Sequence, residues 1–323
     1  MMKRRNRMKF YFQIFLCAAC LLFCACAAPV QTQEDLPAPP AAQSTHKQPA
    51  TPMPGPKKTT QPDIPDHTED LAQEAVVVRE GDTLELHIIP QLVEAFSMTE
   101  SEIKEVLEAA KSKLISSETQ GFRRMEGIIV PGSYYTEGKT LNENVELWIT
   151  HAEARYDTLE SKIAKQNRLL ASERLVLASI IEWECIGAPF EIETSAVLQN
   201  RLGKNARLGC CSTLEYAAGY SRPFMTTADT KISSTYNTYK IRGLPPGPIC
   251  VTGTAALEAA MAETSDFDLY YFFYDYARGT MQFFNEYRDF KEAANASKEL
   301  FLKTFPDIGR HDKIDRRSLF GNY

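Results

Sequence analysis

The sequence predicts an α+β fold, in which a small N-terminal module precedes a larger helix-rich domain with a short antiparallel sheet. Apolar residues recur at helical spacing in several long segments of the second half of the chain. Short runs rich in Val, Tyr and Phe, bounded by turn residues, predict strands near both ends of the folded region. A hydrophobic content of 44% is sufficient for a core.

The composition divides the chain into five parts. We assign residues 1–26 to a membrane anchor, 27–73 to a disordered linker, 74–120 to the small module, 121–310 to the larger domain and 311–323 to a C-terminal tail. The linker holds ten of the 18 prolines and too few apolar side chains to offset chain entropy. The net charge is −6, although residues 1–25 carry five basic and no acidic side chains. An acidic body argues against nucleic acid as a partner.

The first 26 residues have the pattern of an export signal, with a basic head before an apolar run. Phe23-Cys24-Ala25-Cys26 resembles a bacterial lipoprotein box, which makes Cys26 the candidate for lipidation and Cys20 a second candidate. The alternative is an uncleaved membrane helix. Either anchor would place the remainder on the outer face of the cytoplasmic membrane.

The module is predicted to begin with a strand over 75–78 and a turn at Glu80-Gly81-Asp82. Alternation over 84–89 predicts a second strand, and a capping box from Thr99 to Glu102 opens a helix that reaches about residue 114. The run 81–84, Gly-Asp-Thr-Leu, resembles the start of a LysM-type glycan-binding module.

The larger domain is predicted to be mostly helical. A short strand ends at the Pro131-Gly132 turn, and a loop over 243–249 is preset in shape by three prolines. A hairpin around Arg278-Gly279 joins strands at 269–274 and 281–284. Helices are expected over 141–157, 159–168, 172–185, 191–202, 213–218, 254–263 and 286–304.

The helix over 172–185 is the centre of the domain. It is apolar almost all round and ends with two carboxylates, Glu182 and Glu184. Residues two apart on a helix point about 200° apart, so these glutamates do not form a pair. A carboxyl in an apolar setting holds its proton unless it is paired, and a proton-holding Glu is what a general acid requires. The alternative for either is a structural ion pair.

Several motifs of this domain together resemble the YceG-like (MltG-type) endolytic peptidoglycan transglycosylases. The most specific are Tyr236-Asn237-Thr238-Tyr239 and the Gly-Leu-Pro-Pro-Gly run at 243–247. The other matching positions are Glu126, Gly127, Pro131, Tyr134, 177–184, Val197, 200–202, Arg207, Leu208, Thr213, Tyr216, Asp229 and 248–249.

The resemblance implies cleavage of the bond between N-acetylmuramic acid and N-acetylglucosamine in new peptidoglycan, without water, to a 1,6-anhydro-muramoyl end. It implies that Glu184 is the catalytic acid and base, and that no cofactor or metal takes part. The implied partners are glycan strands, the membrane and cell-wall synthases. The implied substrate-binding residues are Glu182, Asn200, Arg201, Asp229, Tyr236, Asn237 and Tyr239; local ion pairing or ring packing is the alternative for these side chains.

The chain departs from the family pattern at four positions. The family usually reads Asp-Pro-Thr where this chain has Cys211-Ser212-Thr213, and it tends to have His near Met281 and Phe290. The departures leave open a second hypothesis, a catalytically silent glycan-binding or scaffold lipoprotein. A third is a hydrolytic muramidase, for which Asp229 is the nearest second carboxylate. Disulfides that join Cys185 to Cys210, Cys211 or Cys250 are as plausible as buried thiols.

Overall fold

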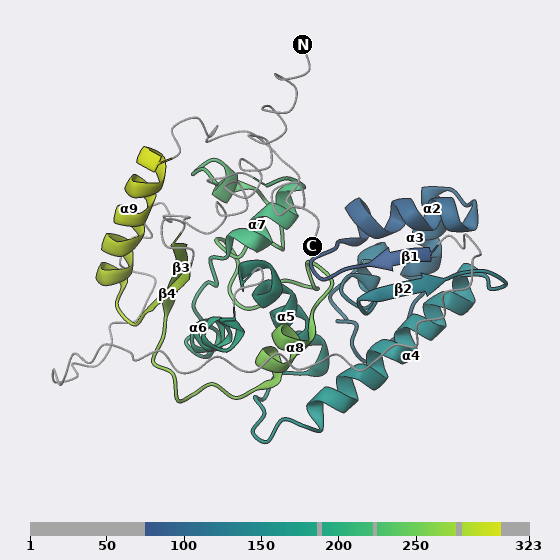
Figure 1. Cartoon of the computed structure of the whole chain (residues 1–323), viewed down its shortest axis with the longest axis horizontal. Coiled ribbons are helices and arrows are strands. Elements are labelled where there is room, and N and C mark those ends of the chain that lie inside the picture. The colour runs from purple at the N-terminus through teal and green to yellow at the C-terminus, as the bar shows by residue number, and fades with distance from the viewer. Residues whose placement is uncertain (1–74, 186–188, 222–224, 276–279, 305–323) are drawn as a thin grey trace, which may run out of the picture.

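The computed structural model describes residues 75–185, 189–221, 225–275 and 280–304. It confirms a helix-rich α+β architecture, in which the described strands form two separate two-stranded antiparallel sheets (Figure 1). The predicted anchor, the linker and the tail lie outside the described residues. Among the described helices, none is both long and apolar enough to cross a bilayer.

The N-terminal module is built on a sheet whose two strands are far apart in sequence. Strand β1 (Ala75–Val78) pairs antiparallel with β2 (Gly132–Tyr135), with Val76 opposite Tyr134. Between the strands lie a π-helical turn (Leu84–Ile88), α2 (Ile89–Phe96), α3 (Glu100–Glu108) and a 3-10 turn (Gly121–Met125). The sheet therefore takes in residues beyond the boundary that we placed at 120. The strand predicted to end at the Pro131-Gly132 turn is not formed, because the chain before Pro131 makes the 3-10 turn and further turns; β2 begins only at Gly132.

The prediction of a second strand over 84–89 is wrong, because this segment is helical. The Thr83 side chain accepts a hydrogen bond from the Leu86 N–H, which caps the first turn. Pro90 lies in the first turn of α2, where its missing N–H is harmless. Leu84, Ile88 and Leu92 are spaced by four residues and all are buried, so the helical period places them on one face.

The helix predictions hold for most of the chain. The capping box of Thr99 and Glu102 forms at the start of α3, but this helix ends at Glu108 and not near residue 114. A second capping box starts α4 (Leu141–Glu160). The central helix is α5 (Ala171–Cys185), and it contacts α6 (Glu191–Gly203), α7 (Cys211–Ala218) and α8 (Thr254–Met261). The helix predicted over 159–168 does not form beyond the end of α4; Gln166 instead forms a single bridge with Ala262.

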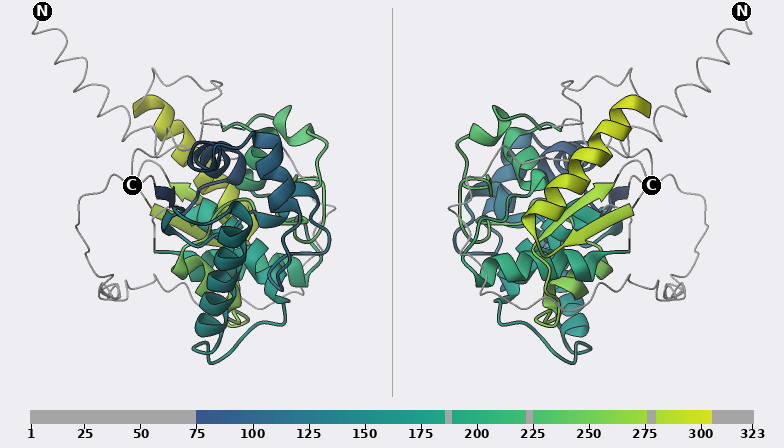
Figure 2. Two further views of the ribbon diagram at one scale, coloured as in Figure 1. Left: turned by 90° about the vertical axis from the view of Figure 1, so that its right-hand side faces the viewer. Right: turned by 90° about the vertical axis from the view of Figure 1, so that its left-hand side faces the viewer.

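A hairpin and the last helix close the larger domain. Strands β3 (Tyr271–Asp275) and β4 (Thr280–Phe284) pair antiparallel, as predicted, and α9 (Tyr287–Thr304) crosses one face of the hairpin (Figure 2). Phe290 of α9 stacks on Tyr271 at 5.5 Å, and the Ser297 hydroxyl donates to Asp275 at 2.9 Å. Phe290 thus belongs to the packing between α9 and the sheet.

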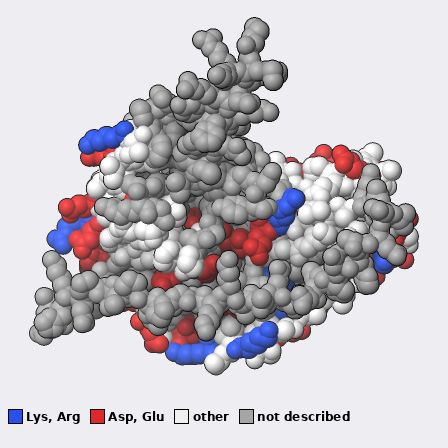
Figure 3. Space-filling view, viewed as in Figure 1, with Lys and Arg blue, Asp and Glu red and all other residues white. Residues whose placement is uncertain are grey.

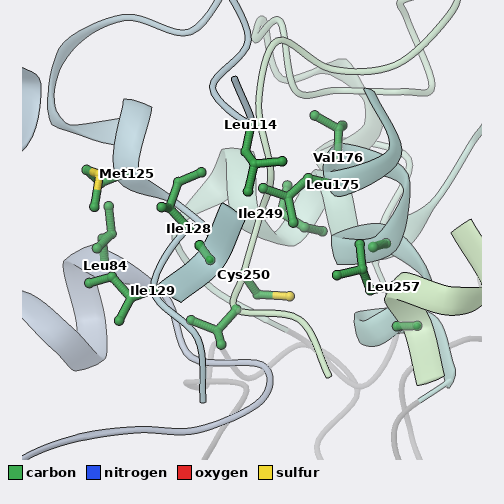
Figure 4. Packing of buried hydrophobic residues seen from close by; sticks show 14 of the residues in the cluster. Leu84, Leu114, Met125, Ile128, Ile129, Leu175, Val176, Ile249, Cys250 and Leu257 are labelled. Atoms are coloured by element: carbon green, nitrogen blue, oxygen red, sulfur yellow. The ribbon is translucent and has the colours of Figure 1, made fainter. Parts of the chain in front are cut away.

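One hydrophobic core runs from the module into the larger domain. In Figure 4, Ile128 and Ile129 lie on the module side and Leu175 on the α5 side, with Ile249 and Cys250 near the middle. All five side chains are buried. The proline-rich loop over 243–249 therefore leads into the seam between the two parts, which buries apolar surface on both sides.

Cys185 does not form the bridges that were one of our two alternatives. Cys185, Cys210 and Cys250 are buried thiols. The Cys185 thiol donates to the Thr194 hydroxyl at 3.2 Å, and the Cys250 thiol donates to the Ser179 carbonyl at 3.3 Å. Burial raises the pKa of Cys185 and of Cys210 well above the ordinary thiol value, so both remain protonated.

Candidate active site

Glu184 lies in the last turn of α5 and is almost completely buried, with 3% of its surface exposed. Its Oε1 atom accepts two hydrogen bonds from one residue of α7, from the Ser212 hydroxyl at 2.7 Å and the Ser212 N–H at 3.2 Å. Ser212 is the second residue of α7, where N–H groups have no partner inside the helix. The Glu184 carboxyl thus caps α7 from outside, in place of the N-cap residue Cys210, whose side chain makes no capping bond.

Glu182 lies on the other side of the same turn and serves a different helix. It accepts a hydrogen bond from the Gly253 N–H at 2.8 Å. Gly253 is the N-cap of α8 and has no side chain to cap it. The two glutamates therefore point apart, as the spacing predicts, and each satisfies the positive end of a separate helix.

The Glu182 carboxyl is a weaker acid than an ordinary glutamate because of its surroundings. Burial is the largest cause that raises the pKa of Glu182 to about 7; Glu80 and Glu191 add to the rise, while the Gly253 hydrogen bond and Arg155 oppose it. Figure 3 shows acidic side chains gathered near the middle of one face of the molecule. A carboxyl with this pKa holds its proton through much of the neutral range.

The start of α7 is anchored by the Tyr-Asn-Thr-Tyr segment. The Thr238 hydroxyl accepts from the Cys210 N–H at 2.9 Å and lies 2.7 Å from the Thr213 hydroxyl. The Thr238 carbonyl accepts from the Gly209 N–H at 3.1 Å, and Gly209 has a φ of +61°, which favours glycine. Thr238 therefore fixes the end of α7 that presents Ser212 to Glu184.

Asn237 and Asp229, both predicted to bind substrate, make hydrogen bonds within the loop that leads from α7 to Thr238. The Asn237 amide donates to the carbonyls of Thr230 and Ile232, at 3.0 and 2.8 Å, and its oxygen accepts from the Tyr239 N–H. Asp229 accepts from the Tyr220 hydroxyl at 2.7 Å and from the N–H and hydroxyl of Thr226. Both side chains are buried, so these contacts hold the loop together.

The two predicted tyrosines contact α7. The Tyr236 ring packs on the ring of Tyr216 at 4.9 Å, and burial raises the pKa of Tyr236 to about 12. The Tyr239 hydroxyl lies 3.1 Å from the Cys211 sulfur, at the first residue of α7. Cys211, where the chain departs from the family pattern, is thus adjacent to Ser212, which binds Glu184. Tyr239 contacts the same end of α7.

Asn200 and Arg201 connect α6 to the segment that leads into β3. The Asn200 amide donates to the carbonyls of Phe267 and Leu269, at 2.7 and 2.9 Å. The Arg201 guanidinium donates to the Tyr270 carbonyl at 2.7 Å and lies 5.3 Å from the Tyr271 ring centre. Glu184 is one of several ionisable groups whose charge acts on the Arg201 guanidinium.

The N-terminal module contacts α5 through Trp183, the residue between Glu182 and Glu184. The Trp183 indole N–H donates to the Gly81 carbonyl at 3.0 Å. Gly81 and Asp82 also exchange backbone hydrogen bonds with Val251, at 2.9 and 2.8 Å. The Gly-Asp-Thr-Leu turn is therefore engaged by the larger domain next to Glu184.

A second contact across this seam involves a buried carboxyl. Glu126 is fully buried and accepts from the Leu84 N–H at 3.0 Å and from the Tyr216 hydroxyl at 2.9 Å. Burial raises the pKa of Glu126 to about 7, despite these two bonds and the nearby Arg123. The side chain thus ties the module to α7 while holding a proton below neutral pH.

Sequence reasoning missed Ser212, Thr238 and Trp183 as site residues. Thr238 lies inside a motif that we singled out, and Ser212 lies one residue before the predicted start of a helix, a position typical of capping residues. Met281 is buried in β4. Among the residues that the structure describes, no group of three or more His, Cys, Asp or Glu is arranged to bind a metal ion.

The family model for the YceG-like family matches residues 57–296 of the sequence. The chain belongs to the YceG-like family. A Bacillus subtilis protein named endolytic murein transglycosylase is 33% identical over 139 residues, which cover 42% of this chain and 38% of that protein. A Streptococcus pneumoniae protein of the same name is 29% identical over 171 residues, which cover 51% of this chain and 31% of that protein.

The matched segments thus span less than two fifths of these relatives. A YceG-like protein of Listeria monocytogenes has the same fold as this chain, with a TM-score of 0.58 and 24% sequence identity. The structural match covers 69% of this chain and 76% of the Listeria chain.

Proposed function

We propose that this YceG-like protein is an endolytic murein transglycosylase, with Glu184 as its acid and base. The observation that carries the proposal is the placement of Glu184, a nearly buried carboxyl held by two donors from Ser212 at the start of α7. The curated relatives that share this part of the sequence are named for the same activity.

One carboxyl can perform the whole reaction. Protonated Glu184 donates its proton to the glycosidic oxygen as the bond from this oxygen to the muramoyl anomeric carbon breaks. The muramoyl C6 hydroxyl then attacks the anomeric carbon and transfers its proton to the Glu184 carboxylate. The products are a 1,6-anhydro-muramoyl end and a new N-acetylglucosamine end, and Glu184 is protonated again without consumption of water.

The arrangement of the other carboxylates favours this route over hydrolysis. Glycosidases that use water or a covalent intermediate need a second carboxylate across the bond from the first. Glu182 lies on the opposite side of α5 and binds Gly253, and Asp229 is held by Tyr220 and Thr226. A nucleophile supplied by the substrate removes the need for such a pair.

The N-terminal module supports a LysM-like assignment by its chain order. The module begins with strand β1, continues through helices α2 and α3, and ends with strand β2. The two strands pair antiparallel. We propose that the module extends the glycan-binding surface of the larger domain. Its Gly81-Asp82 turn contacts Val251 and Trp183, which would keep the two surfaces in a fixed relation.

We also propose that the protein is anchored through Cys26 at the outer face of the cytoplasmic membrane. The basic head, apolar run and cysteine-containing box of residues 1–26 support an anchor, and the proline-rich linker would supply reach. Murein as substrate fits this location, and cell-wall synthases that make new strands there are the expected protein partners.

The test is a digest of uncross-linked glycan strands by the full chain in detergent, analysed by mass spectrometry. We expect anhydro-muramoyl ends with the wild type and none with Glu184→Gln. Glu173→Gln changes a glutamate in the first turn of the same helix and should cleave as the wild type does. Reducing muramoyl ends would indicate a hydrolase. Strand binding without any cleavage would refute the enzyme and favour the silent scaffold, for which the departures at Cys211, Met281 and Phe290 argue.

A further inference from the structure

Two hydrogen bonds from a single residue converge on one oxygen of Glu184. The Ser212 hydroxyl and the Ser212 N–H both donate to Oε1, at 2.7 and 3.2 Å. A carboxylate oxygen has about two lone-pair sites, and these donors occupy both. The two bonds therefore fix the Oε1 atom of Glu184 against the start of α7.

The two donors are held in place by the structure around them. Ser212 is 1% exposed, and its N–H belongs to the first turn of α7, where no helical carbonyl competes for it. The helix start is fixed by Thr238, which contacts both Cys210 and Thr213. The direction of both bonds is thus set before any substrate binds, as preorganised electrostatic stabilisation requires.

This contact depends on the residue type at position 212. The family pattern that the sequence resembles has proline here, between Asp and Thr. Proline has neither an N–H nor a hydroxyl, so it could supply neither of the two bonds. In this chain serine provides both donors, next to a cysteine that cannot supply the carboxylate of the pattern.

We propose that Ser212 is the positioning residue of Glu184, on the basis of the function proposed above. It holds the carboxyl in one orientation through Oε1. When Glu184 gives up its proton to the glycosidic oxygen, negative charge develops on the carboxylate, and the two Ser212 donors stabilise that charge at Oε1. The C6 hydroxyl proton then returns to the carboxylate.

The kinetic test compares three variants of the full chain. Ser212→Ala removes the hydroxyl donor and should lower kcat by about 10- to 100-fold with little change in KM, the range for loss of a charge-assisted hydrogen bond. Ser212→Thr keeps a hydroxyl and should restore most of the rate. Ser297→Ala is the matched control, because it removes a buried serine that donates to Asp275 in another part of the domain. A rate for Ser212→Ala equal to that of the control would overturn the proposal.

A second measurement decides the matter without turnover. The side-chain carboxyl of Glu184 is observed by carbon-13 NMR at one fixed pH, assigned by comparison with Glu184→Gln. We expect Ser212→Ala to change the chemical shift of this carboxyl carbon, because Oε1 loses the hydroxyl donor, and Ser297→Ala to leave it unchanged. An unchanged chemical shift in Ser212→Ala would overturn the proposal. A changed chemical shift in a protein that cuts no strands would uphold the contact and refute the proposed function instead.

Discussion

Replacement of Glu126 by glutamine should stabilise the protein at neutral and alkaline pH. Glu126 is fully buried at the seam between the module and α7, with the Leu84 N–H and the Tyr216 hydroxyl as partners. Glutamine has nearly the same shape. Its carbonyl oxygen can accept from Leu84, and its amide can donate to the Tyr216 oxygen, so both contacts survive the change.

The magnitude follows from the pKa of the buried carboxyl. Burial raises this pKa from 4.5 to about 7, so the folded protein disfavours the ionised form. The folded state is therefore favoured most below pH 4.5, loses stability as the pH rises through 7, and bears the full penalty above that. At about 1.4 kcal/mol for each pKa unit, the loss is about 3 kcal/mol. Glu126→Gln removes it.

The assay is urea unfolding at pH 4.5 and at pH 8, followed by tryptophan fluorescence. Of the two tryptophans, Trp183 lies at the same seam and reports its opening. The variant and the wild type should differ little at pH 4.5, and the variant should be more stable by about 3 kcal/mol at pH 8. Glu105→Gln, an exposed change on α3, is the control. A variant that is equally stable or less stable than the wild type at pH 8 would refute the reasoning.

Three further changes probe the end of α5. Glu182→Gln should also stabilise the fold above pH 7, because the pKa of Glu182 is raised to about 7. The gain should be smaller than for Glu126→Gln, since the Glu182 side chain is partly exposed, and urea unfolding at pH 5 and 8 measures it. Trp183→Phe removes the donor to Gly81 and should lower the free energy of unfolding by about 1 kcal/mol in urea. Thr238→Val leaves the buried Cys210 N–H without its acceptor and should lower the free energy of unfolding by about 1–3 kcal/mol, which a melting curve would detect. The same change should lower kcat, which a strand digest would measure.

Local pattern was sufficient to predict most of the helices. The segment of α5 could be placed to within a residue because no Gly or Pro interrupts it and its apolar positions run almost all round. The opposite directions of Glu182 and Glu184 followed from the helical period alone. The segment over 84–89 failed because its alternation of apolar and polar residues fits a strand, while Thr83 and Pro90 favour a helix start.

The contacts that organise the site could not be predicted from local pattern. Ser212 lies 28 residues from Glu184 in sequence, and Gly81 lies 102 residues from Trp183. Periodicity indicates which face of a helix is buried but not which distant element covers it. The motif over 236–239 suggested substrate contacts, yet Thr238 and Asn237 act on neighbouring backbone, a role that depends on the closed loop.

Three consecutive residues at the end of α5 bind three separate parts of the molecule. Glu182 binds the start of α8, Trp183 binds the turn of the module and Glu184 binds the start of α7. A shift of any one of these parts would act on the same helical turn, and so on the carboxyl that we propose as the acid. The shared core and the backbone bonds between Gly81, Asp82 and Val251 oppose such a shift. Under the function proposed above, we therefore expect the module to contribute to catalysis by holding Glu184 in place.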